Sequence, residues 1–336
     1  MTGSADPLLI PKLGDSLAGR LRLLNLWPLS QGEILGQQET FLDKIFNQDI
    51  PSTGETVECS KGLLLGKIFE GGYPTLLSIE SEKQKNAWLN DYISLVLQKD
   101  ILELSRIENI TEIPNLLILL ASRVGCLLNV EELARALRLS SMTLHRYLGL
   151  LQTLFLVHLL PPWHTNLGKR LVKSPKIYLT DTALQLFLLN MDRERLSKDP
   201  NLMGKILENF VVLELLKQLS WNEQNIQMYY YRDYQHSEID IILEGPGGKL
   251  VAIEIKSSET VSPDDAKSLK AFQEMAKEKF VQGILLYAGT THLSFGEKSQ
   301  PLLSLLYGVN SAYFLSFFPF GLLAAALYII GFLDPI

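Results

Sequence analysis

The stretch "EIDIILEGPGGKLVAIEIKSS", residues 238–258, predicts two β-strands joined by a tight turn. Isoleucine, leucine and valine fill both strands, and a glycine- and proline-rich run at 245–248 separates them, as in a β-hairpin. Four charged residues interrupt this apolar pattern: Glu238, Asp240, Glu254 and Lys256. Because charged groups are rarely buried without partners, their placement in these strands asks for an explanation.

The alternation along the two strands predicts how they pair. Side chains two residues apart share one face of a strand. If Asp240 lies opposite Glu254, then Ile242 lies opposite Ala252, and the other two charges also face each other. This register needs a loop of odd length, about five residues, and leaves the second face of the hairpin apolar. The pattern therefore predicts that the four charges converge on one face.

Two carboxylates from neighbouring strands form an oxygen-rich site that suits Mg²⁺ or Mn²⁺. A third carboxylate, Glu208, lies upstream on a predicted helix, "LMGKILENFVVLELLKQL". We expect Glu208, Asp240 and Glu254 to bind the metal, and these three with Lys256 to form the catalytic set. Such a cation would acidify a bound water, while Lys256 would orient that water or neutralise charge on a phosphate. The alternative is that the strand charges form only a ladder of salt bridges.

Composition bounds the class of protein. The chain has 336 residues, of which 47% are hydrophobic, enough for two or three domains with a sizeable core. Its net charge of −6 means that any nucleic-acid binding must be local. Cys59 and Cys126 have no partners at metal-ligand spacing, which argues against a zinc finger or a disulfide scaffold and fits the cytoplasm. The opening residues do not resemble a signal peptide.

The segment "NVEELARALRLSSMTLHRYLGLLQT" predicts a helix-turn-helix. Asn129 is expected to cap a first helix over 130–138, with Glu132 at the position of a capping box. Ser140 or Ser141 caps a second helix that runs to about residue 153. The second helix of such a pair can enter the major groove of DNA.

A strand, "LFLVHLL", and a basic segment, "NLGKRLVKSPKIYLTD", follow the helix pair. Together they predict a basic hairpin, which includes Lys176 and completes a winged helix. The alternative is a domain that only packs against its neighbours. The expected DNA contacts come from the second helix and the hairpin: Thr143, His145, Arg146, Lys169, Arg170 and Lys173.

Asp240 followed by Glu254-Ile255-Lys256, with Glu208 on the preceding helix, resembles the D…(D/E)-x-K signature of the restriction-endonuclease-like fold. More broadly, the chain is similar to a prokaryotic family of AAA-type ATPase proteins whose C-terminal half is the domain of unknown function DUF4143. The resemblance runs in family order from about Thr2 to Tyr307. Its segments include "SLAGRLRLLNLWPLSQGEI", "EGGYPTLLS", "WLNDYISLVLQKDI", "PPWHTNLGKRLVKSPKIYLTDTAL", "GKILENFVVLELLKQ", "YYYRDYQHSEIDIILE" and "VAIEIKSSETV".

The resemblance implies a multidomain α/β chain: a helical segment, a winged helix-turn-helix and a PD-(D/E)XK nuclease-like α/β domain. The expected parts are a remnant of a AAA-type ATPase domain at 1–50, a helical lid-like region at 51–115, the winged helix-turn-helix at 116–198, the DUF4143 domain at 199–308 and an apolar tail at 309–336. Family members normally carry a phosphate-binding loop ahead of the matching region, so we expect an N-terminally truncated chain.

The segment "GDSLAGRL" has the glycine spacing of a phosphate-binding loop. Arg20 and Leu21, however, stand where that loop needs lysine and then serine or threonine. We therefore expect neither ATP binding nor ATPase activity from this chain.

The tail "AYFLSFFPFGLLAAALYIIGFL", residues 312–333, is long enough to span a bilayer. The alternatives to a membrane-spanning helix are a buried helix and a segment produced by out-of-frame readthrough. The expected protein is therefore cytoplasmic, or anchored to a membrane through 309–336. It would be a DNA-associated protein with a nuclease-like Mg²⁺ or Mn²⁺ site. The alternative is a non-catalytic remnant that docks on DNA, on another protein or on homologous ATPase subunits.

Overall fold

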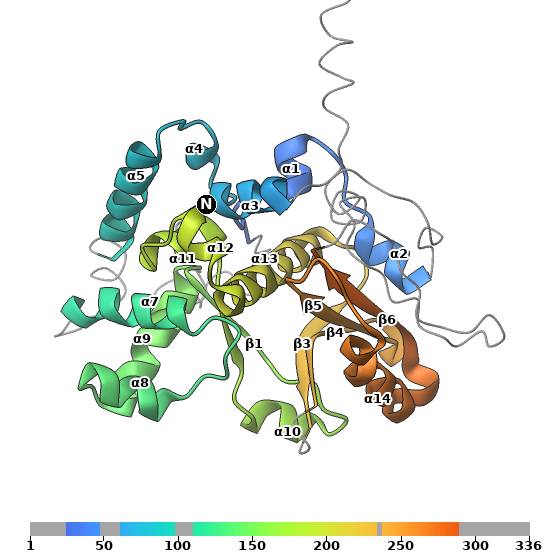
Figure 1. The fold of residues 1–336 in the computed structure, drawn as a ribbon. Helices are drawn as coiled ribbons and strands as arrows, with labels where there is room; N and C mark the ends of the chain where they lie inside the picture. Colours follow the sequence, from blue (N-terminus) through green and yellow to red (C-terminus); the bar gives the residue numbers. More distant parts are fainter. Residues whose placement is uncertain (1–24, 48–60, 98–109, 234–236, 289–336) are drawn as a thin grey trace, which may run out of the picture. The chain divides into compact units, whose positions relative to one another are not determined.

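A computed structural model of the chain describes residues 25–47, 61–97, 110–233 and 237–288 (Figure 1). Two compact units make up the chain. Unit 1 takes in Gly66–Leu213 and Met228–Arg232, together with the residues up to Pro28. Unit 2 takes in Leu29–Leu65 and Glu214–Gln227, together with the residues from Asp233.

Unit 1 is mainly helical. Its helices are α4 (Pro74–Leu77), α5 (Glu82–Leu95), α7 (Ile113–Ser122), α8 (Val130–Leu137), α9 (Ser141–Thr153), α10 (Leu167–Val172), α11 (Thr182–Leu188) and α12 (Arg193–Ser197), with the second half of α3 (Lys61–Glu70) and the first part of α13 (Pro200–Trp221). The apolar side of α7 is fully buried, as are the inward residues of α9. Helix packing therefore forms the core of this unit.

The two helices α8 and α9 lie where the sequence predicts them. The side chain of Asn129 accepts a hydrogen bond from the backbone N–H of Glu132, so the predicted N-cap is confirmed. The Glu132 carboxylate, however, pairs with Arg123 at 2.6 Å. At the second helix, the Ser140 hydroxyl accepts from the backbone N–H of Thr143, which makes Ser140 the cap.

Two short antiparallel strands, β1 (Val157–Leu160) and β2 (Lys176–Leu179), follow α9. They form the predicted hairpin, but its connection is longer than a simple turn and contains α10. The Asn166 side chain accepts from the backbone N–H groups of Gly168 and Lys169, and this starts the helix. Lys176, expected on a basic surface, is buried instead.

Unit 2 is built on strands β4 (Glu238–Glu244), β5 (Leu250–Lys256) and β6 (Phe280–Tyr287), with α14 (Lys267–Ala276) between β5 and β6. Strands β4 and β5 are antiparallel, whereas β5 and β6 are parallel. Parallel neighbours need a crossover connection, and α14 lies within that connection. Helices α1 (Gln31–Leu35) and α2 (Phe41–Asn47) also belong to this unit. The order α13, β3 (Gln227–Arg232), β4, β5, α14, β6 is the predicted αβββαβ order.

The predicted hairpin register is confirmed. Ile242 pairs with Ala252, and five residues, 245–249, separate the two strands. Gly247 and Gly248 both take a φ of 72°, a conformation that favours glycine. Strand β5 is paired along both edges, by β4 and β6, and is buried from Leu250 to Ile255. On the charged face of the hairpin, Glu254 is buried, whereas Glu238, Asp240 and Lys256 are partly exposed.

Several expectations fall on residues outside this description. They are the "GDSLAGRL" segment, most of the N-terminal remnant and the tail at 309–336. Within the described ranges, no helix is both long enough and apolar enough to cross a membrane.

Candidate functional site

Strands β4 and β5 bring three of the predicted site residues together. Ile241 pairs with Ile253, and Asp240 and Glu254 are the next residues along the two strands. The Asp240 carboxylate accepts a hydrogen bond of 2.8 Å from the backbone N–H of Ile255. The Lys256 ammonium lies 2.7 Å from Glu254 Oε1. Asp240, Glu254 and Lys256 thus form a mixed-charge cluster on the hairpin.

The cluster keeps Lys256 positively charged. Burial alone would lower the pKa of Lys256, but the carboxylates of Glu254, Asp240 and Asp265 outweigh it and raise that pKa. A lysine with a raised pKa is a poor general base at neutral pH. It can neutralise an anion, and it already neutralises Glu254. A divalent cation would therefore compete with Lys256 for Glu254 Oε1.

Glu208, the third expected ligand, is engaged elsewhere. It belongs to unit 1, whereas Asp240 and Glu254 belong to unit 2. Its Oε1 accepts hydrogen bonds from the Lys176 ammonium at 3.0 Å and from the Tyr178 hydroxyl at 2.6 Å. Across the described parts of the chain, no group of three or more His, Cys, Asp or Glu side chains is placed to hold a metal ion.

The Glu208 ion pair was missed at the sequence level, although one signal points to it. Lys176 and Tyr178 alternate in "KIYL", so both project from the same face of β2. A lysine and a tyrosine on one face of a buried strand require an acceptor, and a glutamate in an apolar helix can supply it. Lys176 is only 2% exposed, which makes this pair part of the core.

The expected DNA contacts differ in how accessible they are. His145 and Arg146 on α9 and Lys169 on α10 are exposed. The Thr143 hydroxyl lies 2.8 Å from the Ser140 hydroxyl at the helix cap. Lys173 is half-buried.

Arg170 is largely committed to its own unit. Its guanidinium lies over the rings of Trp163 and Tyr229, at 5.4 and 4.8 Å from their centroids, and its Nε donates to the His164 carbonyl. Partial burial, followed by the charges of Lys169, Lys173 and Arg170, lowers the pKa of His164. Burial is the larger cause, and the three cations act in the same direction.

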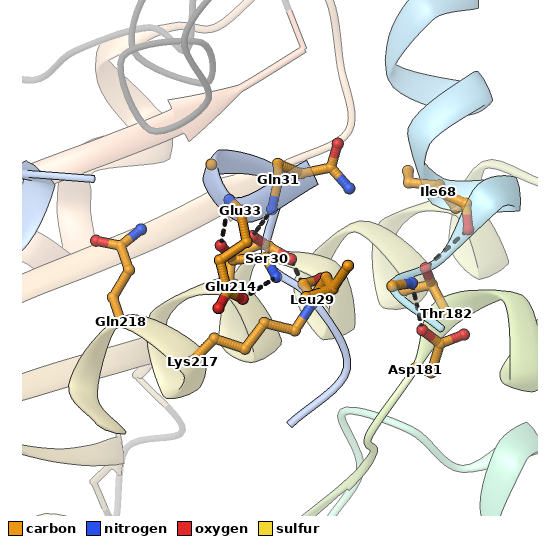
Figure 2. Close-up of polar contacts among 12 residues, drawn as sticks. Leu29, Ser30, Gln31, Glu33, Ile68, Asp181, Thr182, Glu214, Lys217 and Gln218 are labelled. Carbon is orange, nitrogen blue, oxygen red and sulfur yellow. Dashed lines mark hydrogen bonds and ion pairs between the residues drawn. The ribbon is translucent and has the colours of Figure 1, made fainter. Parts of the chain in front are cut away.

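A second buried polar cluster, in unit 2, was also missed (Figure 2). Glu214 on α13 accepts from the backbone N–H of Gln31 at 2.9 Å and pairs with Lys217 at 2.7 Å. The Lys217 ammonium also donates to the Leu29 carbonyl at 3.0 Å. These bonds hold the start of α1 on α13.

Glu39 extends this cluster. Its Oε2 accepts from the Ser30 hydroxyl at 2.6 Å, and its Oε1 accepts from the backbone N–H of Gly32 at 3.3 Å. Burial raises the pKa of Glu39 to about 7; the nearby Glu214 charge adds to the rise, while Ser30, Gly32 and Lys217 oppose it. Two carboxylates and one ammonium share this buried space, so a proton on Glu39 balances the charge.

Asp181, also drawn in Figure 2, has a structural role in unit 1. Its Oδ2 accepts from the backbone N–H of Gly72 at 2.7 Å, and its Oδ1 caps α11 through the N–H of Leu184. Gly71 has a φ of 66°, and a Cβ atom there would lie 2.5 Å from the Asp181 carboxylate. This close approach explains why the "EGGYP" segment needs glycine at 71.

These features define a mixed α/β chain that buries polar clusters in both of its units. Residues 203–306 match DUF4143, a domain of unknown function, and residues 63–195 match DUF8612, also a domain of unknown function. The chain therefore contains a DUF4143 domain, as the resemblance implied.

Curated relatives and a solved structure show further likeness. An uncharacterized protein of Mycobacterium tuberculosis is 31% identical over 270 residues, covering 80% of this chain and 54% of that protein. An uncharacterized protein of Methanocaldococcus jannaschii is 25% identical over 287 residues, covering 83% of this chain and 59% of that protein. The chain spans about half the length of the curated relatives it matches. One solved structure is similar in part: a chain from an assembly of Thermococcus gammatolerans McrB AAA+ hexamers with bound McrC. The alignment covers 65% of this chain and 52% of that chain, at 13% sequence identity and a TM-score of 0.27.

Replacing Glu208 by glutamine is expected to lower the free energy of unfolding by about 3 kcal/mol, because the buried Lys176 ammonium loses its carboxylate. Urea unfolding followed by circular dichroism measures the loss. Glu194→Gln is the matched control, because its pair with Lys198 is exposed and such pairs contribute less than about 1 kcal/mol. If Glu208→Gln is as stable as the parent, the ion pair is not part of what holds unit 1 together.

Because of the buried cluster around Glu39, we expect the free energy of unfolding to fall as the pH rises. The folded-state pKa of Glu39, about 7, lies above its ordinary value of 4.5. Its stabilising contribution is therefore complete below the ordinary value and is lost as the pH rises through 7, on the order of 3 kcal/mol in all. Glu39→Gln mimics the neutral form and should flatten thermal stability between about pH 5 and about pH 8.

The control for this experiment is Glu223→Gln, which removes an exposed carboxylate of unit 2 and should keep the parent's pH dependence. The explanation fails if Glu39→Gln and the parent lose stability equally over this range.

Proposed function

We propose that this chain is a DNA-associated protein, and that α8, α9 and the β1–β2 hairpin bind duplex DNA as a winged helix-turn-helix. One observation carries the proposal. Residues 133–180 hold seven basic residues and no aspartate or glutamate, in a chain whose net charge is −6. The seven are Arg135, Arg138, Arg146, Lys169, Arg170, Lys173 and Lys176. Lys176 is buried against Glu208 and Arg170 stacks on two rings, so the other five supply the local positive charge, which favours a polyanionic partner.

The geometry of α9 supports the same partner. Its inward residues, including Leu144, Tyr147 and Leu151, are buried, so its outer face is free to contact a groove. Arg146 and His145 lie on that outer face and are exposed. Arginine can contact either a phosphate or the edge of a guanine.

Binding of the full chain to a labelled duplex of about 30 base pairs tests this function, by fluorescence anisotropy across a salt series. Each phosphate contact contributes about 0.9 to the slope of log affinity against log salt. Arg146→Ala should therefore weaken binding and reduce that slope by about 1. Lys270→Ala is the control, because Lys270 is exposed on α14 in unit 2 and should leave both quantities unchanged. Absence of saturable binding by the parent at low salt would refute the function.

The hairpin in unit 2 supports a second candidate function, a nuclease-like site for Mg²⁺ or Mn²⁺. The observation in its favour is the register that places the Asp240 and Glu254 carboxylates on neighbouring strands beside Lys256. Two carboxylates and nearby backbone carbonyls are ligands that these cations accept. The cation would supply a more acidic water, and Lys256 would neutralise charge on a phosphate.

The pairing of Lys256 with Glu254 favours weak metal binding over efficient catalysis, since the ammonium already balances the carboxylate. For this reason we keep an alternative to the nuclease function: a non-catalytic DNA- or protein-binding remnant of a AAA-type ATPase. In that alternative, intact homologous ATPase subunits are further partners. In both, this chain is expected to have no ATPase activity of its own.

Calorimetric titration with Mn²⁺ decides whether the hairpin binds metal. Asp240→Asn should remove most of the binding heat, because it removes a charged ligand yet keeps an oxygen that can accept from the Ile255 N–H. Asp264→Asn, which alters an exposed carboxylate of the same unit, should leave the heat unchanged. Equal heats for Asp240→Asn and the parent would mean that these acids serve only the fold.

A further inference from the structure

Helix α10 lies in the connection between β1 and β2 (Figure 1). It exposes three large aliphatic side chains. Leu167 is 69% exposed, Leu171 is 88% exposed and Val172 is 82% exposed. Leu167 and Leu171 are four residues apart, so they lie one above the other on the same face of the helix. Three exposed aliphatic side chains within six residues form a local apolar patch, and such patches mark interaction surfaces.

Two sets of contacts hold the helix that carries this patch. Arg170, in the middle of α10, is fixed by the rings of Trp163 and Tyr229 and by its bond to the His164 carbonyl. Asn166 caps the first turn of the helix. The contacts of Arg170 therefore hold α10 to its own unit, although no residue of this helix is itself buried.

The surroundings of the patch are cationic. Lys169 lies between the two leucines in sequence and Lys173 follows directly after Val172. The pKa of His164 is lowered first by burial and then by the charges of Lys169, Lys173 and Arg170, which lie close to it. An apolar tip flanked by cations fits either the minor groove of a nucleic-acid duplex or the surface of an anionic bilayer.

The observations favour the duplex. A single myristoyl chain binds a bilayer only marginally, and three aliphatic side chains insert less hydrocarbon than that chain does. The acid-free segment also links α10 to the exposed arginine of α9, so both can act on one polyanion. Rigid aliphatic side chains are what proteins insert between base pairs when they bend DNA.

We propose that α10 is a wedge that bends DNA. Leu167 and Leu171 enter the minor groove and partly unstack one base step, while Lys169 contacts a neighbouring phosphate. The wedge rests on the proposed DNA-binding function and adds that the bound duplex is kinked.

Fluorescence energy transfer between the ends of a duplex of about 30 base pairs measures the bend. Saturation with the full chain is expected to shorten the end-to-end distance. The double variant Leu167→Ala/Leu171→Ala should abolish this change and weaken binding about tenfold. It should leave the salt slope unchanged, because it removes no charge. Both side chains are exposed, so the double variant should melt at the parent's temperature.

Two further variants distinguish the effect of the apolar side chains from the effect of the positive charge. Lys169→Ala should reduce the salt slope by about 0.9 yet keep the bend. Leu167→Met/Leu171→Met should keep the bend, because methionine is also used as an apolar wedge. Loss of the bend in Lys169→Ala together with its retention in the double alanine variant would overturn the assignment.

These experiments test the wedge separately from the proposed DNA-binding function. Saturable binding with no change in energy transfer overturns the wedge and leaves the DNA-binding function standing. No saturable binding overturns both. Co-sedimentation with phosphatidylserine vesicles is the second arm. If the double alanine variant loses vesicle binding but still bends DNA like the parent, α10 is a membrane contact and the wedge is wrong.

Discussion

Much of this structure depends on one constraint: helix α13 carries buried carboxylates, and each of them must be paired with a lysine. One helix carries Glu208 and Glu214 into apolar surroundings, and each is matched by an ammonium, Lys176 or Lys217. A buried charge is costly unless it is paired and hydrogen-bonded, so each pair fixes the segment that supplies its partners. In unit 1 that segment is β2, through its lysine and tyrosine. In unit 2 it is the start of α1, through backbone groups.

The hairpin register could be predicted because strand periodicity is two, and pairing Asp240 with Glu254 places all four charges on one face. Ile242 opposite Ala252 and the five-residue loop follow from that pattern alone. The position of Glu208 could not be predicted in the same way. A glutamate in an apolar helix signals that a partner exists, but its identity depends on which strand packs there. The notion of a shared metal site overlooked the lysine and tyrosine of "KIYL" as competitors for that carboxylate.

Burial of the hairpin changes how its charges are to be understood. Glu254 has only 10% of its side chain exposed, because β5 is a central strand. Lys256 is one-third exposed, so the pair has one end in the core and one near water. Such a pair satisfies the fold without any ligand, and it also leaves a cationic group accessible to a phosphate. The same residues therefore support both a structural and a functional interpretation, which metal titration separates.

The basic segment shows how sequence can overstate a binding surface. Residues that look equivalent in "NLGKRLVKSPK" divide into three roles once the chain folds. Lys176 balances a buried carboxylate, Arg170 stacks on two rings, and Lys169 remains exposed. The first two roles tie the hairpin to its own unit. Under the proposed DNA-binding function, these internal cations would position the helix that carries both the exposed lysine and the exposed leucines, and so reduce the entropy lost on binding.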